Sequence, residues 1–355
     1  MPLAITVIPG PPTQAELAEL HEPAGAGALV LDMLALGVCG TDREILAGQY
    51  GTPPPGRERL VLGHESLGRV RSAPTGSGLE PGDLVAGIVR RPDPEPCPCC
   101  AGGEFDMCRN GRYRERGIKE LDGYGAERVA LEPEYAVPID ARLGRLGVLT
   151  EPASVVVKAW EQIDRLRFGS CRPFERVLVT GAGPIGLLAA LLAVERGLSV
   201  HVLDRVAEGP KPQLAAALGA YHTGELAAVF GETGPDLVIE CTGVPALALE
   251  AVRASAPGAV ICLLGVSPRG IALDLDAGEL NDELVLGNRV VFGSVNANRR
   301  HFTAAAEALA RADRDWLDGL ITRRVPLDRW AEALRPSPLD VKTVIEFASD
   351  SREPA

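Results

Sequence analysis

The chain has no excess of positively charged residues. Its 355 residues include 36 Lys and Arg against 48 Asp and Glu, which gives a formal net charge of -12 at pH 7 and a pI of about 5.1. Nucleic acid and anionic membranes would both be repelled by such a surface, so neither is an expected partner. A small molecule is the expected binding partner.

Long hydrophobic runs are also missing, and we expect no secretory leader. The longest apolar stretches, such as residues 185–194, are shorter than the roughly 20 residues that a transmembrane helix needs. The first residues lack the basic region, apolar stretch and small-residue cleavage site of a secretory signal. We therefore expect a cytoplasmic protein without a membrane-spanning segment.

Two domains are expected, because 355 residues exceed the size at which one hydrophobic core stops growing. Residues up to about 138 are rich in Gly, Pro and short apolar runs, which is typical of a mostly antiparallel β domain. From residue 176 buried strands alternate with helices, at 177–180, 199–203, 237–240, 259–264 and 289–292. This alternation predicts an α/β fold with a doubly wound parallel sheet.

A glycine-rich turn follows the first strand of that sheet. Gly181, Gly183 and Gly186 have the Gly-x-Gly-x-x-Gly spacing, with Pro184 and Ile185 between the last two. Between a strand and an apolar helix, this spacing allows a tight turn and a close approach of the backbone to a pyrophosphate. The sequence predicts a dinucleotide site here, and Thr242, after a later strand, is a further candidate.

The residues after the second strand bear on the choice of dinucleotide. Asp204 lies about twenty residues beyond the glycines, where a carboxylate can bind the adenosine ribose, and this favours NAD. The adjacent Arg205 could instead pair with a 2′-phosphate, so use of NADP stays open. A solvated Asp-Arg pair without a role in binding is the simpler alternative.

Three residues with metal-binding side chains lie in the N-terminal part. Cys39, His64 and Glu65 offer a thiolate, an imidazole and a carboxylate, which suit a catalytic Zn²⁺ that keeps one place for substrate. A closed structural zinc site is the alternative, although its ligands usually occur as close-spaced pairs.

The string Gly63-His64-Glu65-Ser-Leu-Gly68, with Pro81-Gly82-Asp83-Leu-Val85, resembles the zinc-dependent medium-chain alcohol dehydrogenases. The resemblance implies a GroES-like catalytic domain over residues 1–155, a Rossmann domain over 156–296 and a return to the first domain over 297–355. It also implies Glu151 as third zinc ligand, with Glu65 as an alternating or neighbouring partner. Thr41 would then bind the substrate hydroxyl, unless it caps a helix, and Glu44 stands where many relatives have His.

Four cysteines lie within twelve residues: Cys97, Cys99, Cys100 and Cys108. They resemble the structural-zinc lobe of the same family, but alignment on Cys108 puts the first expected cysteine at Pro94. Cys99 could replace it. A second, structural zinc is therefore expected, with reduced thiols that bind no metal as the alternative.

Several further strings resemble the archaeal glucose dehydrogenase branch, among them Tyr113-Arg-Glu115-Arg and Gly293-Ser-Val-Asn296. The resemblance implies oxidation of D-glucose or a similar aldose at C1 to a lactone, with Glu115, Asn296 and His301 near the sugar. A surface ion pair for Glu115 and a turn for Asn296 are the alternatives. The family resemblance also implies a homodimer or homotetramer.

Two other functions remain open. A polyol, cyclitol or amino-sugar alcohol dehydrogenase could use the same metal and cofactor motifs with a different pocket. A nucleotide-binding sensor without turnover could keep the fold, but it would have no need of Cys39, Thr41, His64 and Glu151 beside an intact glycine-rich turn.

Overall fold

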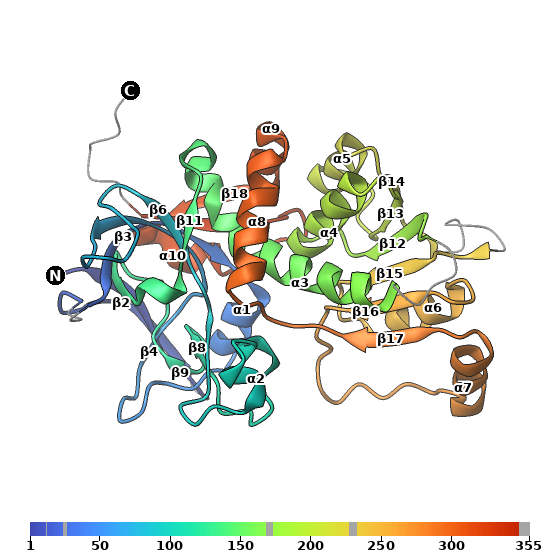
Figure 1. The fold of residues 1–355 in the computed structure, drawn as a ribbon, viewed down its shortest axis with the longest axis horizontal. Coiled ribbons are helices and arrows are strands. Elements are labelled where there is room, and N and C mark those ends of the chain that lie inside the picture. The colour runs from blue at the N-terminus through green and yellow to red at the C-terminus, as the bar shows by residue number, and fades with distance from the viewer. Residues whose placement is uncertain (12, 24–26, 168–172, 227–232, 348–355) are drawn as a thin grey trace. The chain divides into compact units, whose positions relative to one another are not determined.

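The computed structural model describes residues 1–11, 13–23, 27–167, 173–226 and 233–347 (Figure 1). The chain divides into two compact units. Unit 1 comprises Met1–Ser154 and Asn296–Ala355, and unit 2 comprises Val155–Val295. No helix within the described ranges is both long and apolar enough to cross a bilayer.

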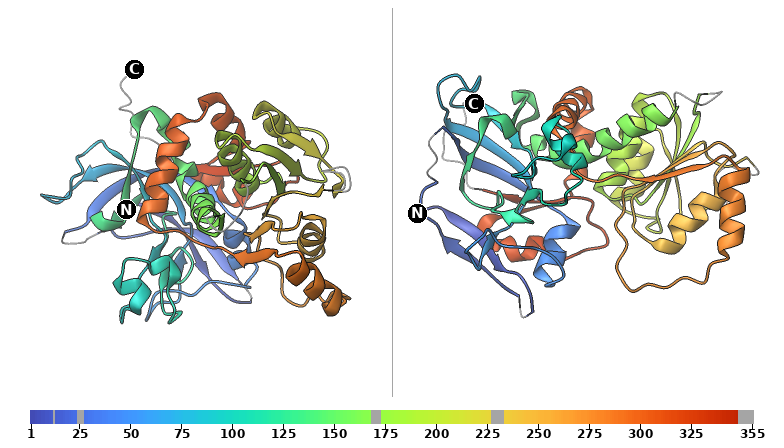
Figure 2. Two further views of the ribbon diagram at one scale, coloured as in Figure 1. Left: turned by 45° about the vertical axis from the view of Figure 1, so that its right-hand side comes forward. Right: turned by 60° about the horizontal axis from the view of Figure 1, so that its bottom comes forward.

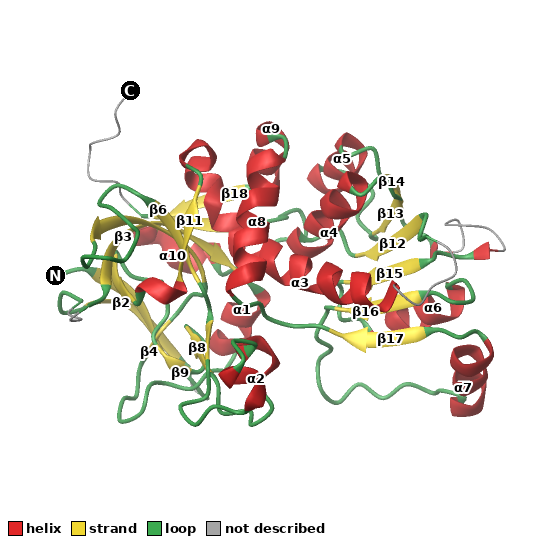
Figure 3. Ribbon diagram, viewed as in Figure 1, coloured by secondary structure: helices red, strands yellow, loops and turns green. Residues whose placement is uncertain are grey.

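Unit 1 is built mainly from β-sheets, coloured yellow in Figure 3. Its largest sheet has the order β11-β6-β5-β3-β19-β18, with β10 also paired to β3. Smaller sheets have the orders β2-β1-β4 and β7-β8-β9. The strands are β1 (Leu3–Ile8), β2 (Gln14–Glu19), β3 (Leu29–Val38), β4 (Leu60–Val61), β5 (Glu65–Ser72), β6 (Leu84–Gly87), β7 (Arg90–Arg91), β8 (Arg114–Arg116), β9 (Glu120–Leu121), β10 (Arg128–Leu131), β11 (Ala136–Ile139), β18 (Arg323–Pro326) and β19 (Thr343–Glu346).

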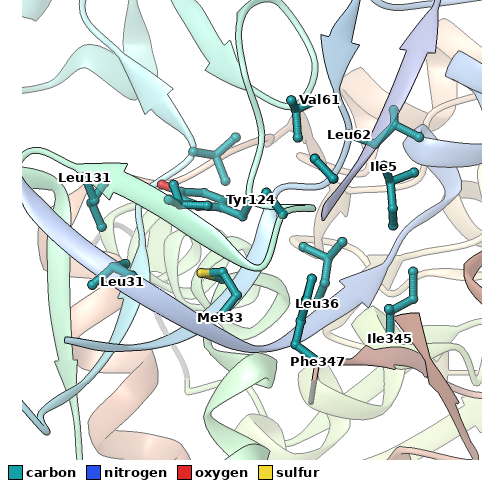
Figure 4. Close-up of a cluster of buried hydrophobic side chains, with 14 of the residues drawn as sticks. Ile5, Leu31, Met33, Leu36, Val61, Leu62, Tyr124, Leu131, Ile345 and Phe347 are labelled. Carbon is teal, nitrogen blue, oxygen red and sulfur yellow. The ribbon is translucent and has the colours of Figure 1, made fainter. Parts of the chain in front are cut away.

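The central strand of the large sheet is β3, whose last six residues are all buried. Because it has neighbours on both edges, β3 pairs antiparallel with β5 on one side and with β19 on the other. Strand β19 comes from the end of the chain, so residues about 300 positions apart lie side by side, as Thr343 does with Val38. Figure 4 shows Leu36 of β3 and Ile345 of β19 within the core cluster of this unit.

Short helices connect the strands of unit 1. Helix α1 (Gly40–Leu46) follows β3 directly, and α8 (Arg299–Arg311) begins at the side-chain cap Asn298. The others are α2 (Pro98–Ala101), η1 (Phe105–Met107), η2 (Pro133–Tyr135), η3 (Ala141–Leu149), α9 (Arg314–Leu320), η6 (Leu327–Arg329) and α10 (Trp330–Ala333). Helix α3 (Thr150–Arg167) begins in unit 1 and continues into unit 2.

Unit 2 is a parallel sheet with the strand order β14-β13-β12-β15-β16-β17. Helix α4, green, and helix α6, gold, lie on opposite faces of the sheet (Figure 2). Strands β13 and β14 are added on one side of β12, and strands β15 to β17 on its other side. Sheets of this kind bind ligands at the carboxyl ends of the two strands where the order switches, here β12 and β15. The elements are β12 (Arg176–Thr180), α4 (Pro184–Glu195), β13 (Ser199–Leu203), α5 (Pro210–Ala217), β14 (Tyr221–Thr223), β15 (Leu237–Glu240), α6 (Pro245–Ala254), β16 (Val260–Leu263), α7 (Ala277–Leu286) and β17 (Val290–Gly293).

Candidate active site

Cys39, His64 and Glu65 meet at one end of the large sheet in unit 1. Their ligand atoms all lie within 4.8 Å of one another, and His64 and Glu65 are buried. The pairing of β3 with β5 explains this, because Gly37 stands opposite Glu65 and Cys39 follows two residues later. A thiolate, an imidazole and a carboxylate so close together fit a zinc ion.

A side chain that the sequence analysis did not select, Asp42, holds two of these residues. Its Oδ2 accepts a hydrogen bond from the backbone N–H of Cys39 at 2.8 Å, and its Oδ1 lies 3.5 Å from Nδ1 of His64. Nε2 of His64 is then left for a metal ion, as in carboxylate–histidine–zinc arrangements. Burial alone would lower the pKa of His64, but the neighbouring charge of Asp42 raises it well above its usual value. The Cys-x-x-Asp spacing of a helix capping box was the available signal.

Lys342, the residue directly before β19, is the second residue that sequence reasoning missed. Its Nζ donates to the carbonyl of Val38 at 2.9 Å and forms an ion pair with Glu65. The two side chains are only 1% and 3% exposed. The available signal was a lysine directly before a mostly buried strand, because a buried charge needs a partner.

Glu151 and Thr41 lie near this cluster but outside the set of three mutually close ligands. Glu151 is buried in the first turn of α3, where burial and then the charge of Glu65 raise its pKa to about 7 in spite of the opposing charge of His64. Thr41 is the second residue of α1, whose N-cap is Cys39, and its Oγ1 is 4.0 Å from the Cys39 sulfur. Thr41 is therefore not the cap of this helix.

The predicted sugar residues Glu115 and Asn296 are joined directly. Nδ2 of Asn296 donates to Oε1 of Glu115 at 2.6 Å. The same oxygen accepts from Nε and Nη2 of Arg90 at 3.1 and 3.0 Å. The Arg90–Glu115 pair is buried, since both side chains are 6% exposed, so it is not a surface ion pair. Asn296 has a left-handed backbone with φ +63°, which asparagine tolerates better than most residues.

His301 has a different environment from these two residues. Its ring is 1% exposed in the first turn of α8, and Nδ1 accepts a hydrogen bond from the backbone N–H of Asn298 at 3.1 Å. The same asparagine donates to Asp106 at 2.8 Å. His301 therefore helps to hold the N-terminus of α8, and its predicted sugar contact remains a prediction.

Three of the four clustered cysteines come together. The sulfurs of Cys97, Cys100 and Cys108 lie within 4.8 Å of one another, whereas Cys99 is not part of this group. The backbone N–H of Arg109 donates to Cys97 at 3.4 Å, and this bond and a second from Cys100 lower the pKa of the Cys97 thiol to about 6. Because thiolates are the form that binds zinc, three thiols in this arrangement fit a structural ion.

The glycine-rich turn of unit 2 has the geometry that its spacing predicts. Gly181 has φ +89°, and a Cβ on Gly186 would lie 1.8 Å from the carbonyl oxygen of Gly181. A Cβ on Gly183 would meet nothing within 4 Å, which leaves that side of the turn open. Pro184 and Ile185 form the first turn of α4.

Thr242 is held by a buried carboxylate that sequence reasoning did not select. Glu240, at the end of β15, accepts from the N–H of Thr242 at 2.7 Å and from the hydroxyl of Thr180 at 3.1 Å. These bonds link the carboxyl ends of β12 and β15. An acid at the end of an apolar strand was the available signal.

The comparisons with known proteins agree with this architecture. The model of the alcohol dehydrogenase GroES-like domain matches residues 25–141, and the model named glucose dehydrogenase C-terminus matches residues 144–347. The chain belongs to the glucose dehydrogenase family. The predicted fold class, a GroES-like domain with a Rossmann domain in the medium-chain dehydrogenase arrangement, is confirmed.

Relatives within this family match nearly the whole chain. Glucose 1-dehydrogenase of Thermoproteus tenax is 41% identical over 97% of this chain and 99% of its own length. That of Methanocella arvoryzae is 36% identical over 98% of this chain and 99% of its own. The structure of Haloferax mediterranei glucose dehydrogenase in complex with NADP, Zn and gluconolactone has a TM-score of 0.89 and 33% identity, and it covers 98% of this chain and 99% of that one.

Proposed function

We propose that the chain is a zinc-dependent dehydrogenase that oxidises D-glucose, or a closely similar aldose, at C1 to the lactone with NAD⁺ or NADP⁺. The meeting of Cys39, His64 and Glu65 at one buried point carries this proposal. The family membership and the gluconolactone in the Haloferax relative support the sugar and the product. The reaction removes a hydride from C1 and a proton from the hydroxyl.

Cys39 and His64 would hold the catalytic zinc, with Glu65 and Glu151 as the carboxylates that complete or exchange in the set. When bound, zinc acts as a Lewis acid that lowers the pKa of a substrate hydroxyl. Asp42 orients the His64 ring, and Lys342 restrains Glu65. Thr41, beside Cys39, would accept or donate a hydrogen bond at the substrate hydroxyl.

Glu115 and Asn296 would bind sugar hydroxyls. Their mutual hydrogen bond, with Arg90 on the same oxygen, holds both side chains in fixed positions. Fixed polar groups of this kind select substrates because an analogue without the matching hydroxyl leaves them unpaired. We retain a sugar contact for His301 as part of the proposal.

The glycine-rich turn would hold the dinucleotide, with its backbone amides facing the phosphates. Gly181, Gly183, Gly186, Pro184 and Ile185 form that turn, and Thr242 lies at the neighbouring strand end. The three grouped cysteines would hold a second zinc, with Cys99 as candidate fourth ligand. Native mass spectrometry tests this part, because two zinc ions per chain are expected.

We also propose a cytoplasmic homodimer or homotetramer. Among the strands that the structure describes, β17, the last strand of the unit 2 sheet, has a neighbour on one edge only, and its Val290 and Val291 are each 38% exposed. An exposed apolar edge strand can pair with another chain. Light scattering coupled to size-exclusion chromatography would give a monomer mass if this proposal is wrong.

Formation of reduced nicotinamide tests the main proposal. Zinc-loaded protein is assayed with D-glucose, D-galactose, D-xylose, sorbitol and myo-inositol, each with NAD⁺ and NADP⁺, before and after chelation. Chelator-sensitive turnover of aldoses alone is the expected result. Turnover of sorbitol or myo-inositol alone would instead identify a polyol or cyclitol dehydrogenase.

A further inference from the structure

The carboxylate of Asp204 already has three partners within unit 2. Its Oδ2 accepts from the backbone N–H of Ala182 at 2.8 Å and from Nζ of Lys211 at 3.2 Å. Its Oδ1 accepts from the backbone N–H of Val206 at 2.9 Å. The preference for NAD that Asp204 alone predicts requires a carboxylate free to bind the ribose hydroxyls, and here that carboxylate is shared with a lysine.

Lys211 changes the charge at this end of β13. Burial opposes the ionisation of Asp204, but the bonds from Val206 and Ala182 and the charge of Lys211 outweigh it and lower the pKa of the carboxyl. The charges of ionised Asp204 and Lys211 cancel, and the exposed Arg205 adds a positive charge next to Asp204. The exposed Glu208 lies three residues further along the same segment.

The position of the Asp204–Lys211 pair in the fold corresponds to the part of the dinucleotide at which NAD and NADP differ. Lys211 is in the first turn of α5, which follows β13, and its side chain is 15% exposed. In folds with this strand order the residues after the second strand face the adenosine ribose, where NADP carries a phosphate and NAD a hydroxyl. An ammonium group within reach of that position can bind the phosphate through a charge-assisted hydrogen bond.

We propose that Lys211 is the residue that admits NADP⁺ to this chain, by pairing with the 2′-phosphate, together with Arg205, while it stays paired with Asp204. This inference rests on the dinucleotide site of the proposed function. Asp204 would otherwise repel a phosphate dianion, and its pairing with Lys211 in the free protein removes most of that repulsion. The lysine is a specificity residue and takes no part in hydride transfer.

Direct binding tests the proposal without any turnover. Calorimetric titrations of NADP⁺, NAD⁺, 2′,5′-ADP and 5′-AMP are compared for the parent chain and for Lys211→Met. We expect the dissociation constants of the two 2′-phosphorylated ligands to rise about 10- to 100-fold, as for a lost hydrogen bond to a charged group. Those of NAD⁺ and 5′-AMP should change less than about threefold.

Two further variants separate this role from a structural one. Lys211→Arg should keep most of the affinity for 2′,5′-ADP, because it keeps the charge. Arg253→Met removes a cation that is paired with Glu279 at the far end of α6, and it should leave all four affinities unchanged. Thermal unfolding of each variant verifies that it is folded.

Each outcome has a separate meaning. An equal loss of NAD⁺ and NADP⁺ affinity in folded Lys211→Met would overturn the inference, because the lysine would then only support the turn. Unchanged 2′,5′-ADP binding would overturn it as well. Failure of the parent chain to bind either dinucleotide would instead overturn the proposed function.

Discussion

Replacing Lys342 with methionine removes the cation that is buried against Glu65. The two side chains are 1% and 3% exposed, so water cannot take the place of the ammonium group. Breaking a buried pair by removal of one partner costs about 3–5 kcal/mol, because it leaves an uncompensated charge. With about 2–4 °C per kcal/mol for a domain of this size, the unfolding temperature should fall by about 6–20 °C.

Differential scanning fluorimetry of chelated protein measures this loss. The double variant Lys342→Met with Glu65→Gln should unfold at a higher temperature than Lys342→Met alone, because the amide leaves no charge unpaired. Arg329→Met is the surface control, since Arg329 and Glu332 are 58% and 49% exposed and 3.6 Å apart. Exposed pairs contribute about 0–1 kcal/mol, so this variant should stay within a few degrees of the parent.

Zinc should reduce the effect of Lys342→Met, because a bound cation beside Glu65 supplies a second positive charge. The fall in unfolding temperature is therefore expected to be smaller in zinc-loaded than in chelated protein. If chelated Lys342→Met unfolded within about 2 °C of the parent, the reasoning from a buried, charged pair would be refuted. An equal fall with and without zinc would place the metal away from Glu65.

Three other predictions concern the remaining sites. Asn296→Gly keeps the positive φ, which glycine adopts freely, but removes the side-chain amide. The KM for glucose should therefore rise about tenfold in steady-state kinetics, while calorimetry should show unchanged binding of the dinucleotide. An unchanged KM would remove Asn296 from the sugar site. Gly186→Ala should lower the unfolding temperature of the free protein, because its Cβ would lie 1.8 Å from the Gly181 carbonyl oxygen. Gly183→Ala should fold normally and lose dinucleotide affinity. Equal unfolding temperatures of the two variants would contradict this reasoning. In native mass spectrometry, Cys108→Ser should lack one of the two zinc ions and Cys39→Ser should lack the other. Cys39→Ser should also lower kcat at least about 100-fold. Retention of both ions in either variant would exclude that cysteine as a ligand.

Local sequence patterns were sufficient where the physical requirement is itself local. The strand predicted at 259–264 is observed as Val260–Leu263, and the strand at 199–203 as Ser199–Leu203. Buried parallel strands are continuous apolar runs, so they are visible without any knowledge of their neighbours. The glycines of the turn are equally visible, because a positive φ at Gly181 and close packing at Gly186 exclude other residues.

The partners of charged side chains were beyond the reach of those patterns. Lys342 and Glu65 are 277 positions apart and meet because β19 and β5 both pair with β3. The grouping of Cys97, Cys100 and Cys108 without Cys99 likewise depends on how the chain turns at α2. Spacing along the chain does not encode such side-chain directions.

By itself the sequence determined the fold class, the glycine-rich turn and the residue types for a zinc site, because each depends on periodicity or on short-range steric limits. Only the tertiary structure decided that Asp42 and Lys342 support the metal ligands, and that Lys211 shares the carboxylate of Asp204. The energy of a buried charge depends on which opposite charge the fold places beside it, and that placement is made by strand pairing and by turns between elements.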